Sequence, residues 1–402
     1  MESVSKMDEI TPKWGLSKFD PWDNRLNYKN IWTIYREMRH AAPVVYSEAH
    51  GGIWCITRYE DVRNAARDFK TFSSHNVMDI GNANKNTAPR VRRLIELDPP
   101  EHTVHRKVMQ VPFLASKVGE FSDGIRTSIR ELLDKVEKNK EFDIVNDIAE
   151  PVPQDVLAKV LGFDDESRIK NRELVLRFVN ADLETRRERQ EELRAFLLEK
   201  IREKTENPGD DYLSQMCMSE HDGERFTEAE LVGMVQGFAL AGHHTSINAI
   251  ASMLYRLSDE NVKNLYLSDS KWRSKIVEET LRLDPPIHLE GRTTTVATTV
   301  GGVKIPADQS VALIYASANH DESKFEQPET FLPQRDSLQH LAFGHGIHMC
   351  IGMNLARLEM NIILEEVMSR IPNYQLIGEP RDSGMVFGHH MGWEKMPATV
   401  SK

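Results

Sequence analysis

Apolar residues recur every three or four positions along several long stretches of the chain, which is the pattern of amphipathic helices. These stretches are residues 123–138, 189–210, 274–283 and 354–371. Two other stretches, residues 42–62 and 301–321, carry apolar runs on both sides of a turn sequence and predict β-hairpins. We expect the first hairpin to turn at Gly51–Gly52 and the second to turn near residues 306–308.

Helical patterns outnumber strand patterns, and the strands do not alternate with helices as they do in a doubly wound parallel sheet. No stretch rich in proline, glycine or serine divides the 402 residues, and 40% of them are hydrophobic, which is enough for a large core. We therefore predict a mainly α fold, in which one large domain over residues 1–402 holds about a dozen helices and small antiparallel β elements.

One predicted helix, residues 228–257, is long enough to cross the whole domain, because it would measure about 45 Å at 1.5 Å per residue. Thr227 and Glu230 form the sequence pattern of a capping box at its start. Its middle reads AGHHTS, where leucines would be expected in a core helix. Glycine is unfavourable inside a helix, and the hydroxyl of Thr245 is expected to bond back to the carbonyl of Ala241 and bend the helix. Gly242 and Thr245 therefore indicate that a gap and a hydroxyl are needed at that point.

Composition excludes several kinds of partner. The formal net charge of −11 argues against nucleic acid or an anionic membrane as a partner of the whole surface. The first residues contain no apolar signal segment, and no apolar run reaches membrane-spanning length, so no membrane anchor is expected. Three widely separated cysteines, Cys55, Cys217 and Cys350, are typical of a reducing compartment, and we predict a cytoplasmic protein.

Cys350 is the cysteine whose surroundings suggest chemistry. Glycines flank it and a helix follows directly, so backbone N–H groups and the helix N-terminus can stabilise its thiolate. A buried structural cysteine is one interpretation. A zinc site would have at most His345 and His348 as neighbouring ligands, and a cysteine–histidine hydrolase would need a base that the sequence does not identify. Ligation of another metal ion is the remaining alternative.

Residues 343–352, FGHGIHMCIG, resemble the haem-binding signature of the cytochrome P450 monooxygenases, which is Phe, two residues, Gly, one residue, Arg or His, one residue, Cys, one residue, Gly. Glu279 and Arg282 resemble the Glu-x-x-Arg element of that family, and Arg335 resembles the arginine that completes its ion-pair triad. The AGHHTS segment is similar to the oxygen-binding groove of the family's central helix. The segments GGIW, NHD (residues 319–321) and HLAFGHGIH look most like those of bacterial members that hydroxylate monoterpenes.

The resemblance implies that Cys350 is the axial thiolate ligand of haem b, iron protoporphyrin IX, and that Phe343 packs beside the sulfur. A thiolate ligand favours cleavage of the O–O bond. The implied triad of Glu279, Arg282 and Arg335 holds the loop that leads to Cys350. The resemblance also implies cationic or hydrogen-bonding partners for the haem propionates, at His102, Arg106, Arg292, His340 and His348.

The sequence departs from the family pattern at His244, because most members carry an acidic residue directly before the groove threonine, here Thr245. His244 could relay protons with a different pH response, could be a satisfied core histidine, or could contact the substrate. It could also leave O2 activation impaired, with peroxide-driven or reductive activity or a haem-binding sensor as the result. We favour monooxygenation, with Gly242, His244 and Thr245 as catalytic residues, because the glycine and the threonine are both present.

The expected substrate is a small hydrophobic molecule with one polar group, such as a terpenoid. The enzyme would use O2 to hydroxylate or O-dealkylate it. Residues 73–97 are expected to form a lid over it. The chain carries no paired cysteine clusters and no dinucleotide fingerprint, so a separate ferredoxin or flavodoxin should supply electrons, with His105, Arg106 and Lys107 as a basic patch facing it. The resemblance implies a pocket lined by Gly237, Leu240, Ala241, Ile287, His288, Leu289 and Val386 to His389.

Overall fold

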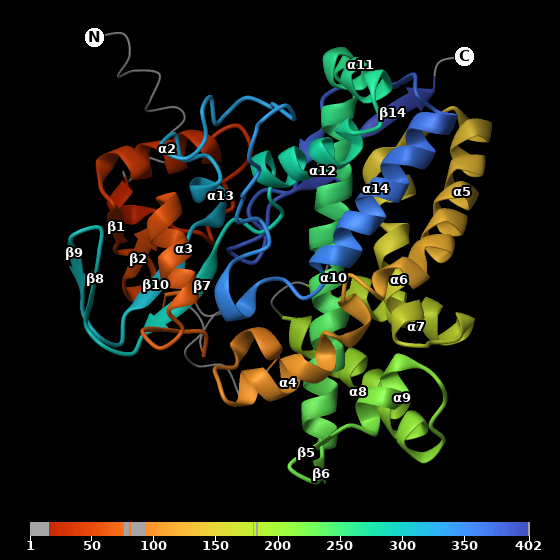
Figure 1. Cartoon of the computed structure of the whole chain (residues 1–402), viewed down its shortest axis with the longest axis horizontal. Coiled ribbons are helices and arrows are strands. Elements are labelled where there is room, and N and C mark those ends of the chain that lie inside the picture. Colours follow the sequence, from red (N-terminus) through yellow and green to blue (C-terminus); the bar gives the residue numbers. More distant parts are fainter. Residues whose placement is uncertain (1–15, 76–79, 82–92, 180, 182–183, 401–402) are drawn as a thin grey trace.

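The computed structural model describes residues 16–75, 80–81, 93–179, 181 and 184–400, and it is mainly helical, as predicted (Figure 1). Thirteen α-helices lie within these residues. They are α2 (Ile31–Ala41), α3 (Tyr59–Arg67), α4 (Glu101–Met109), α5 (Ser122–Asn139), α6 (Pro151–Val160), α7 (Asp165–Val179), α8 (Arg186–Glu206), α9 (Tyr212–Cys217), α10 (Glu228–Leu257), α11 (Glu260–Ser268), α12 (Trp272–Leu283), α13 (Tyr315–Ala318) and α14 (Met353–Arg370). The expectation of a single domain stays a prediction.

Helix α10 is the axis of the helical part, and its bounds agree with the predicted ones. The capping box forms as expected, since the N–H of Glu230 donates to Thr227 Oγ1 at 3.3 Å and the N–H of Thr227 donates to Glu230 Oε2 at 2.7 Å. The helix contacts α6, α8, α12 and α14, and Figure 1 shows it running through the middle of the helical layer. Any group on its inner face is therefore enclosed by other helices.

The strands form one larger sheet and several small ones. The five-stranded sheet has the order β1-β2-β10-β7-β3, and the three-stranded sheet has the order β11-β14-β4. Strands β5–β6, β8–β9 and β12–β13 form two-stranded sheets. The bounds are β1 (Val44–Ser47), β2 (Ile53–Ile56), β3 (Phe72–Ser73), β4 (Glu141–Asp143), β5 (Glu220–His221), β6 (Glu224–Arg225), β7 (Glu290–Thr294), β8 (Thr298–Val300), β9 (Val303–Ile305), β10 (Ser310–Leu313), β11 (Tyr374–Leu376), β12 (Arg381–Asp382), β13 (Trp393–Lys395) and β14 (Pro397–Val400).

One predicted hairpin is confirmed and the other is wrong. Strands β1 and β2 pair antiparallel, as the sequence predicted. Strands β9 and β10 do not pair, because β9 pairs with β8 while β10 pairs with β7 and, in parallel, with the distant β2. The actual hairpin turns at Gly301–Gly302, where both residues have positive φ, 53° and 84°. This backbone is suited to a two-residue hairpin turn, so the glycine pair rather than residues 306–308 makes the turn.

The buried apolar side chains gather in three clusters, two of which contain the cysteines other than Cys350. The larger core cluster surrounds α10 and draws on α5, α6, α8 and α14, while a second cluster packs α2 against the five-stranded sheet. Cys217 belongs to the first cluster and Cys55 to the second, which confirms the structural interpretation of both cysteines. No helix of the described residues is both long and apolar enough to cross a membrane.

Candidate haem-thiolate site

The loop that holds Cys350 lies between the short helix η7 (Gly346–His348) and the first turn of α14. Gly346 has a φ of 75°, and it lies so close to the backbone of Ala66 that a side chain would collide with it. The N–H of Cys350 donates a 2.8 Å hydrogen bond to the carbonyl of Phe343, which closes the loop. The glycine that the signature requires is thus explained by close packing against α3.

The environment of Cys350 favours the thiolate once the sulfur binds a metal ion. Burial raises the pKa of the Cys350 thiol, while the Gly352 backbone N–H and the charges of Arg106 and Arg357 act in the opposite direction. A metal ion deprotonates a coordinating thiol outright, and the same three groups then stabilise the resulting anion. The residues that the structure describes contain no group of three histidine, cysteine or carboxylate side chains able to hold a metal ion, which argues against the zinc alternative.

The middle of α10 shows the polar groove that its sequence predicted. Thr245 Oγ1 donates a 2.6 Å hydrogen bond to the carbonyl of Ala241. Gly237, Ala241 and Thr245 follow one another at four-residue spacing and are at least partly accessible, whereas Phe238, Ala239 and His243 between them are buried. Gly242 is turned toward α6, where an added Cβ would lie 3.3 Å from the Leu157 side chain.

The two adjacent histidines of α10 have different surroundings. His243 is buried, and its Nδ1 accepts a 3.1 Å hydrogen bond from Gln154 Nε2, so it is the satisfied core histidine of the pair. His244 instead faces the C-terminal loop, with its ring 6.0 Å from the rings of Phe387 and His390. Burial lowers the pKa of His244 to about 4, so it is a neutral imidazole at pH 7.

A buried carboxyl group behind Thr245 was missed by the sequence analysis. Glu359 of α14 is 3% exposed and receives a hydrogen bond from Ser246, the residue after Thr245. Burial raises the pKa of Glu359 to about 8, although the bond from Ser246 acts to lower it. The carboxyl group therefore holds a proton at pH 7. The signal in the sequence was a glutamate on the apolar side of residues 354–371, where a charged side chain would not be expected.

Four of the five predicted propionate ligands converge. Burial lowers the pKa of His348, and the nearby charges of Arg292, His102 and Arg106 lower it further. The rings of His102 and His348 meet at 4.4 Å, and the buried Nε2 of each has no hydrogen-bond partner among the described residues. A buried polar atom without a partner is costly, so this set of donors fits a bound group with carboxylates such as the haem propionates.

His340, the fifth predicted ligand, has other partners. Its Nε2 lies 3.2 Å from Glu278 Oε2, and its Nδ1 accepts a 3.2 Å hydrogen bond from the N–H of Ala342. Both ring nitrogens are therefore engaged within the protein, and the expectation that His340 binds a propionate is not supported. The resemblance could not separate His340 from His348, because both lie close to Cys350 in the sequence.

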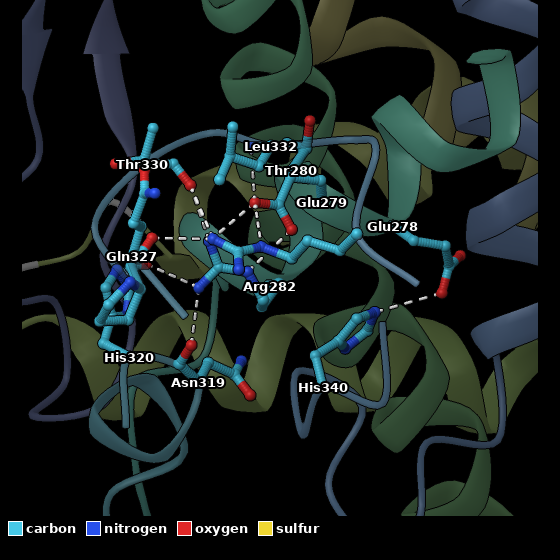
Figure 2. A network of polar contacts seen from close by, with 12 residues as sticks. Glu278, Glu279, Thr280, Arg282, Asn319, His320, Gln327, Thr330, Leu332 and His340 are labelled. Carbon is cyan, nitrogen blue, oxygen red and sulfur yellow. Dashed lines mark hydrogen bonds and ion pairs between the residues drawn. The ribbon is translucent and has the colours of Figure 1, made fainter. Parts of the chain in front are cut away.

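The ion-pair triad forms as the resemblance implied and is buried, and Figure 2 shows the contact between Glu279 and Arg282. Arg282 contacts Glu279 with Nε and Nη2, each at 2.8 Å, and Arg335 Nε donates to Glu279 Oε1 at 3.1 Å. Arg282 also donates to the carbonyl of Asn319 at 2.8 Å, and Asn319 Oδ1 accepts the N–H of Leu341 at 2.6 Å. The triad thus reaches the start of the Cys350 loop through one asparagine.

The predicted substrate contacts divide into two groups. Ala241 is exposed, and Leu240, Ile287 and Val386 are partly exposed. Ile287 and Val386 both pair with His390, which places them in the C-terminal loop region that His244 faces.

His288 and Leu289, by contrast, are 0% exposed. His288 Nδ1 and Tyr35 Oη are 3.2 Å apart, and Leu289 belongs to the core cluster around α2. The predicted contact of these two side chains with substrate is therefore not supported.

Two other predictions concern a lid over the substrate and a basic patch that faces the electron donor. Most of the predicted lid, residues 76–79 and 82–92, lies outside the described residues. The predicted basic patch is not continuous, because His105 is 4% exposed and its Nε2 lies 3.5 Å from Glu230. Arg106 Nη2 donates to the carbonyl of Met349 at 2.7 Å, which ties α4 to the Cys350 loop.

Comparisons with known proteins agree with the site. Residues 271–372 match the family model described as Cytochrome P450. The chain is 35% identical over 361 residues to cyclomarin C epoxidase CymV of Salinispora arenicola, over 86% of this chain and 90% of that protein. It is 27% identical to linalool 8-monooxygenase of Pseudomonas putida, over 87% of this chain and 90% of that protein. The monoterpene likeness of the motifs is therefore loose.

The fold has close counterparts among solved structures. The structure of a mutant of P450 EryK with erythromycin B superposes with a TM-score of 0.83 at 30% identity, over 92% of this chain and 96% of that one. This chain therefore belongs to the cytochrome P450 family, and it is a monooxygenase of the haem-thiolate type.

Proposed function

We propose that the enzyme binds haem b and uses O2, with electrons from a separate ferredoxin or flavodoxin, to hydroxylate or O-dealkylate a small hydrophobic substrate such as a terpenoid. The observation that carries this proposal is the convergence of His102, Arg106, Arg292 and His348 beside the Cys350 loop, with two buried imidazole nitrogens left without partners. A free surface cluster of cations would not bury its donors in this way.

Haem bound between α10 and the Cys350 loop would supply the reduction of O2 and the transfer of one oxygen atom. Residues of the chain would hold the haem, supply protons and position the substrate. Cys350 would bind the iron, and the four converging side chains would hold the propionates. Thr245, whose hydroxyl proton bonds to the Ala241 carbonyl, would offer its oxygen as an acceptor to a proton donor beside O2, and Glu359 would supply a proton through Ser246. Ile287, Val386 and His390 would position the substrate.

The purified protein with its haem tests the proposal. A far-red-shifted Soret band in the ferrous–CO form would report the thiolate ligand, and product formation with a surrogate redox chain would report monooxygenation. Loss of iron-bound water, seen as a spin-state shift, would rank terpenoids against larger molecules such as macrolides. A protein that binds haem through Cys350 but gives no product with any donor would support the sensor alternative instead.

His244→Ala should lower the fraction of consumed electrons that appear in product, by roughly tenfold, and raise peroxide release. The neutral imidazole directly precedes Thr245 in α10, and its loss removes the proton carrier on the side of Thr245 opposite Ser246 in the sequence. Product and peroxide are counted against electrons supplied. His243→Gln, which changes the neighbouring core histidine, is the matched control for folding. Equal coupling in His244→Ala and wild type would remove His244 from the mechanism.

Proton supply from Glu359 should give the coupling a pH dependence. Because its pKa is about 8, the group is protonated at pH 7 and ionises as the pH rises past 8, so coupling should fall above that pH. Glu359→Gln should show low coupling at every pH and no transition near pH 8. The folded pKa exceeds the ordinary value of 4.5, so the unfolded state ionises first and stability falls as the pH rises from about 4.5 to about 8. The glutamine variant should therefore not be less stable at pH 7. A wild-type pH profile retained by the variant would exclude Glu359.

A further inference from the structure

Glu278 and Glu279 are consecutive residues of α12, yet their side chains enter two separate networks (Figure 2). Glu279 belongs to the buried triad. Glu278 is held on the other side, by two hydrogen bonds from Arg357, Nε to Oε1 at 2.6 Å and Nη2 to Oε2 at 2.8 Å, and by the contact with His340. This second network has no part in the triad and connects α12 with α14.

The two networks fix neighbouring backbone groups of the loop before Cys350. The triad reaches the N–H of Leu341 through Asn319, and Glu278 reaches the N–H of Ala342 through His340. The N–H of Ala342 donates to His340 Nδ1, so the other ring nitrogen carries the proton that His340 gives to Glu278. Adjacent glutamates of one helix thus anchor consecutive peptide groups of the loop.

Arg357 is the member of this network that packs against Phe343, at the start of the Cys350 loop. Its guanidinium carbon is 4.6 Å from the centre of the Phe343 ring, and the Phe343 carbonyl accepts the N–H of Cys350. The charge of Arg357 acts on the Cys350 sulfur and lowers the pKa of its thiol, against the effect of burial. The two hydrogen bonds to Glu278 leave the guanidinium little freedom to turn away into solvent, although its side chain is 33% exposed.

A fixed positive charge near a metal–thiolate centre favours the state with one more electron. We propose that Arg357, oriented by Glu278, is a positioning residue that raises the reduction potential of the haem bound by Cys350. The inference rests on Cys350 being the haem ligand, as proposed above. The role of Glu278 is twofold, because it keeps the guanidinium against Phe343 and partly offsets its charge.

The test is the midpoint potential of the haem in the purified holoenzyme, measured by spectroelectrochemical titration. Arg357→Met should lower the equilibrium constant for one-electron reduction by about threefold to tenfold, where tenfold corresponds to about 59 mV. Arg357→Lys keeps the charge and should restore most of the wild-type potential. Glu278→Gln removes the negative charge but keeps an oxygen that accepts from Arg357, so its potential should shift in the opposite direction to that of Arg357→Met.

Arg202→Met is the matched control. Arg202 makes the same two-bonded contact with Glu228, at 2.7 and 2.9 Å, at the far end of α10, and its loss should leave the potential unchanged. Shifts of the same sign in Arg357→Met and Glu278→Gln, or no shift in either, would overturn the inference. The ferrous–CO spectrum separates this outcome from failure of the proposed function. A wild-type protein without the thiolate signature would show that Cys350 is not the haem ligand, whereas a normal signature with unexpected potentials would contradict only the role of Arg357.

Discussion

Cys350→Ser should abolish the far-red-shifted Soret band of the ferrous–CO form and reduce monooxygenase turnover to background. The hydroxyl of serine does not ionise readily, so the iron would lose the strong anionic donor that favours O–O bond cleavage. The loop should keep its shape, because the bond that closes it joins the backbone N–H of residue 350 to the Phe343 carbonyl. Spectra of the reduced, CO-treated protein and turnover with a surrogate redox chain measure the two effects.

Cys217→Ser is the control for this experiment. Cys217 is buried in α9, and its sulfur contacts the carbonyl of Ile201 at 3.7 Å, an interaction that a hydroxyl can also make. That variant should retain both the band and the activity. A Cys350→Ser protein with an unchanged spectrum, or a wild-type protein that never takes up haem, would contradict the assignment of the ligand.

Arg282→Met should lower the free energy of unfolding by about 3–5 kcal/mol, which is the usual cost of breaking a buried ion pair. Arg282 and Glu279 are both 0% exposed, so the substitution leaves a carboxylate in the core with only Arg335 to balance it. It also removes the donors of the carbonyls of Asn319 and Pro328. Urea unfolding followed by circular dichroism measures the change.

An exposed pair of the same spacing provides the comparison. Lys170 and Glu173 are also three residues apart in a helix, but their side chains are 48% and 50% exposed. Lys170→Met should change the unfolding free energy by no more than about 0.5 kcal/mol. A loss below about 1 kcal/mol in Arg282→Met would mean that the triad contributes no more than a surface pair.

The sequence placed the central helix and the cysteine loop more accurately than it placed their neighbours. The capping box at Thr227 and Glu230 and the back-bond of Thr245 to Ala241 involve residues three or four apart, so local patterns reveal them. The pairing of β10 with β2 joins residues that are far apart in the sequence, such as Val311 and Trp54, and the hairpin prediction for residues 301–321 failed there. Local turn propensity does not specify which distant strand is hydrogen-bonded.

By itself, then, the amino-acid sequence determined the mainly helical class, the extent of α10 and the position of the cysteine motif, since each follows from periodicity, capping or spacing over a few residues. Only the tertiary structure decided which side chains share a site. His340, which was predicted to bind a propionate, instead contacts Glu278, 62 residues away in the sequence. Arg357 donates to the same carboxylate from 79 residues away. The physical reason is burial, because a side chain in the core bonds to whichever distant group the packing of helices brings within reach.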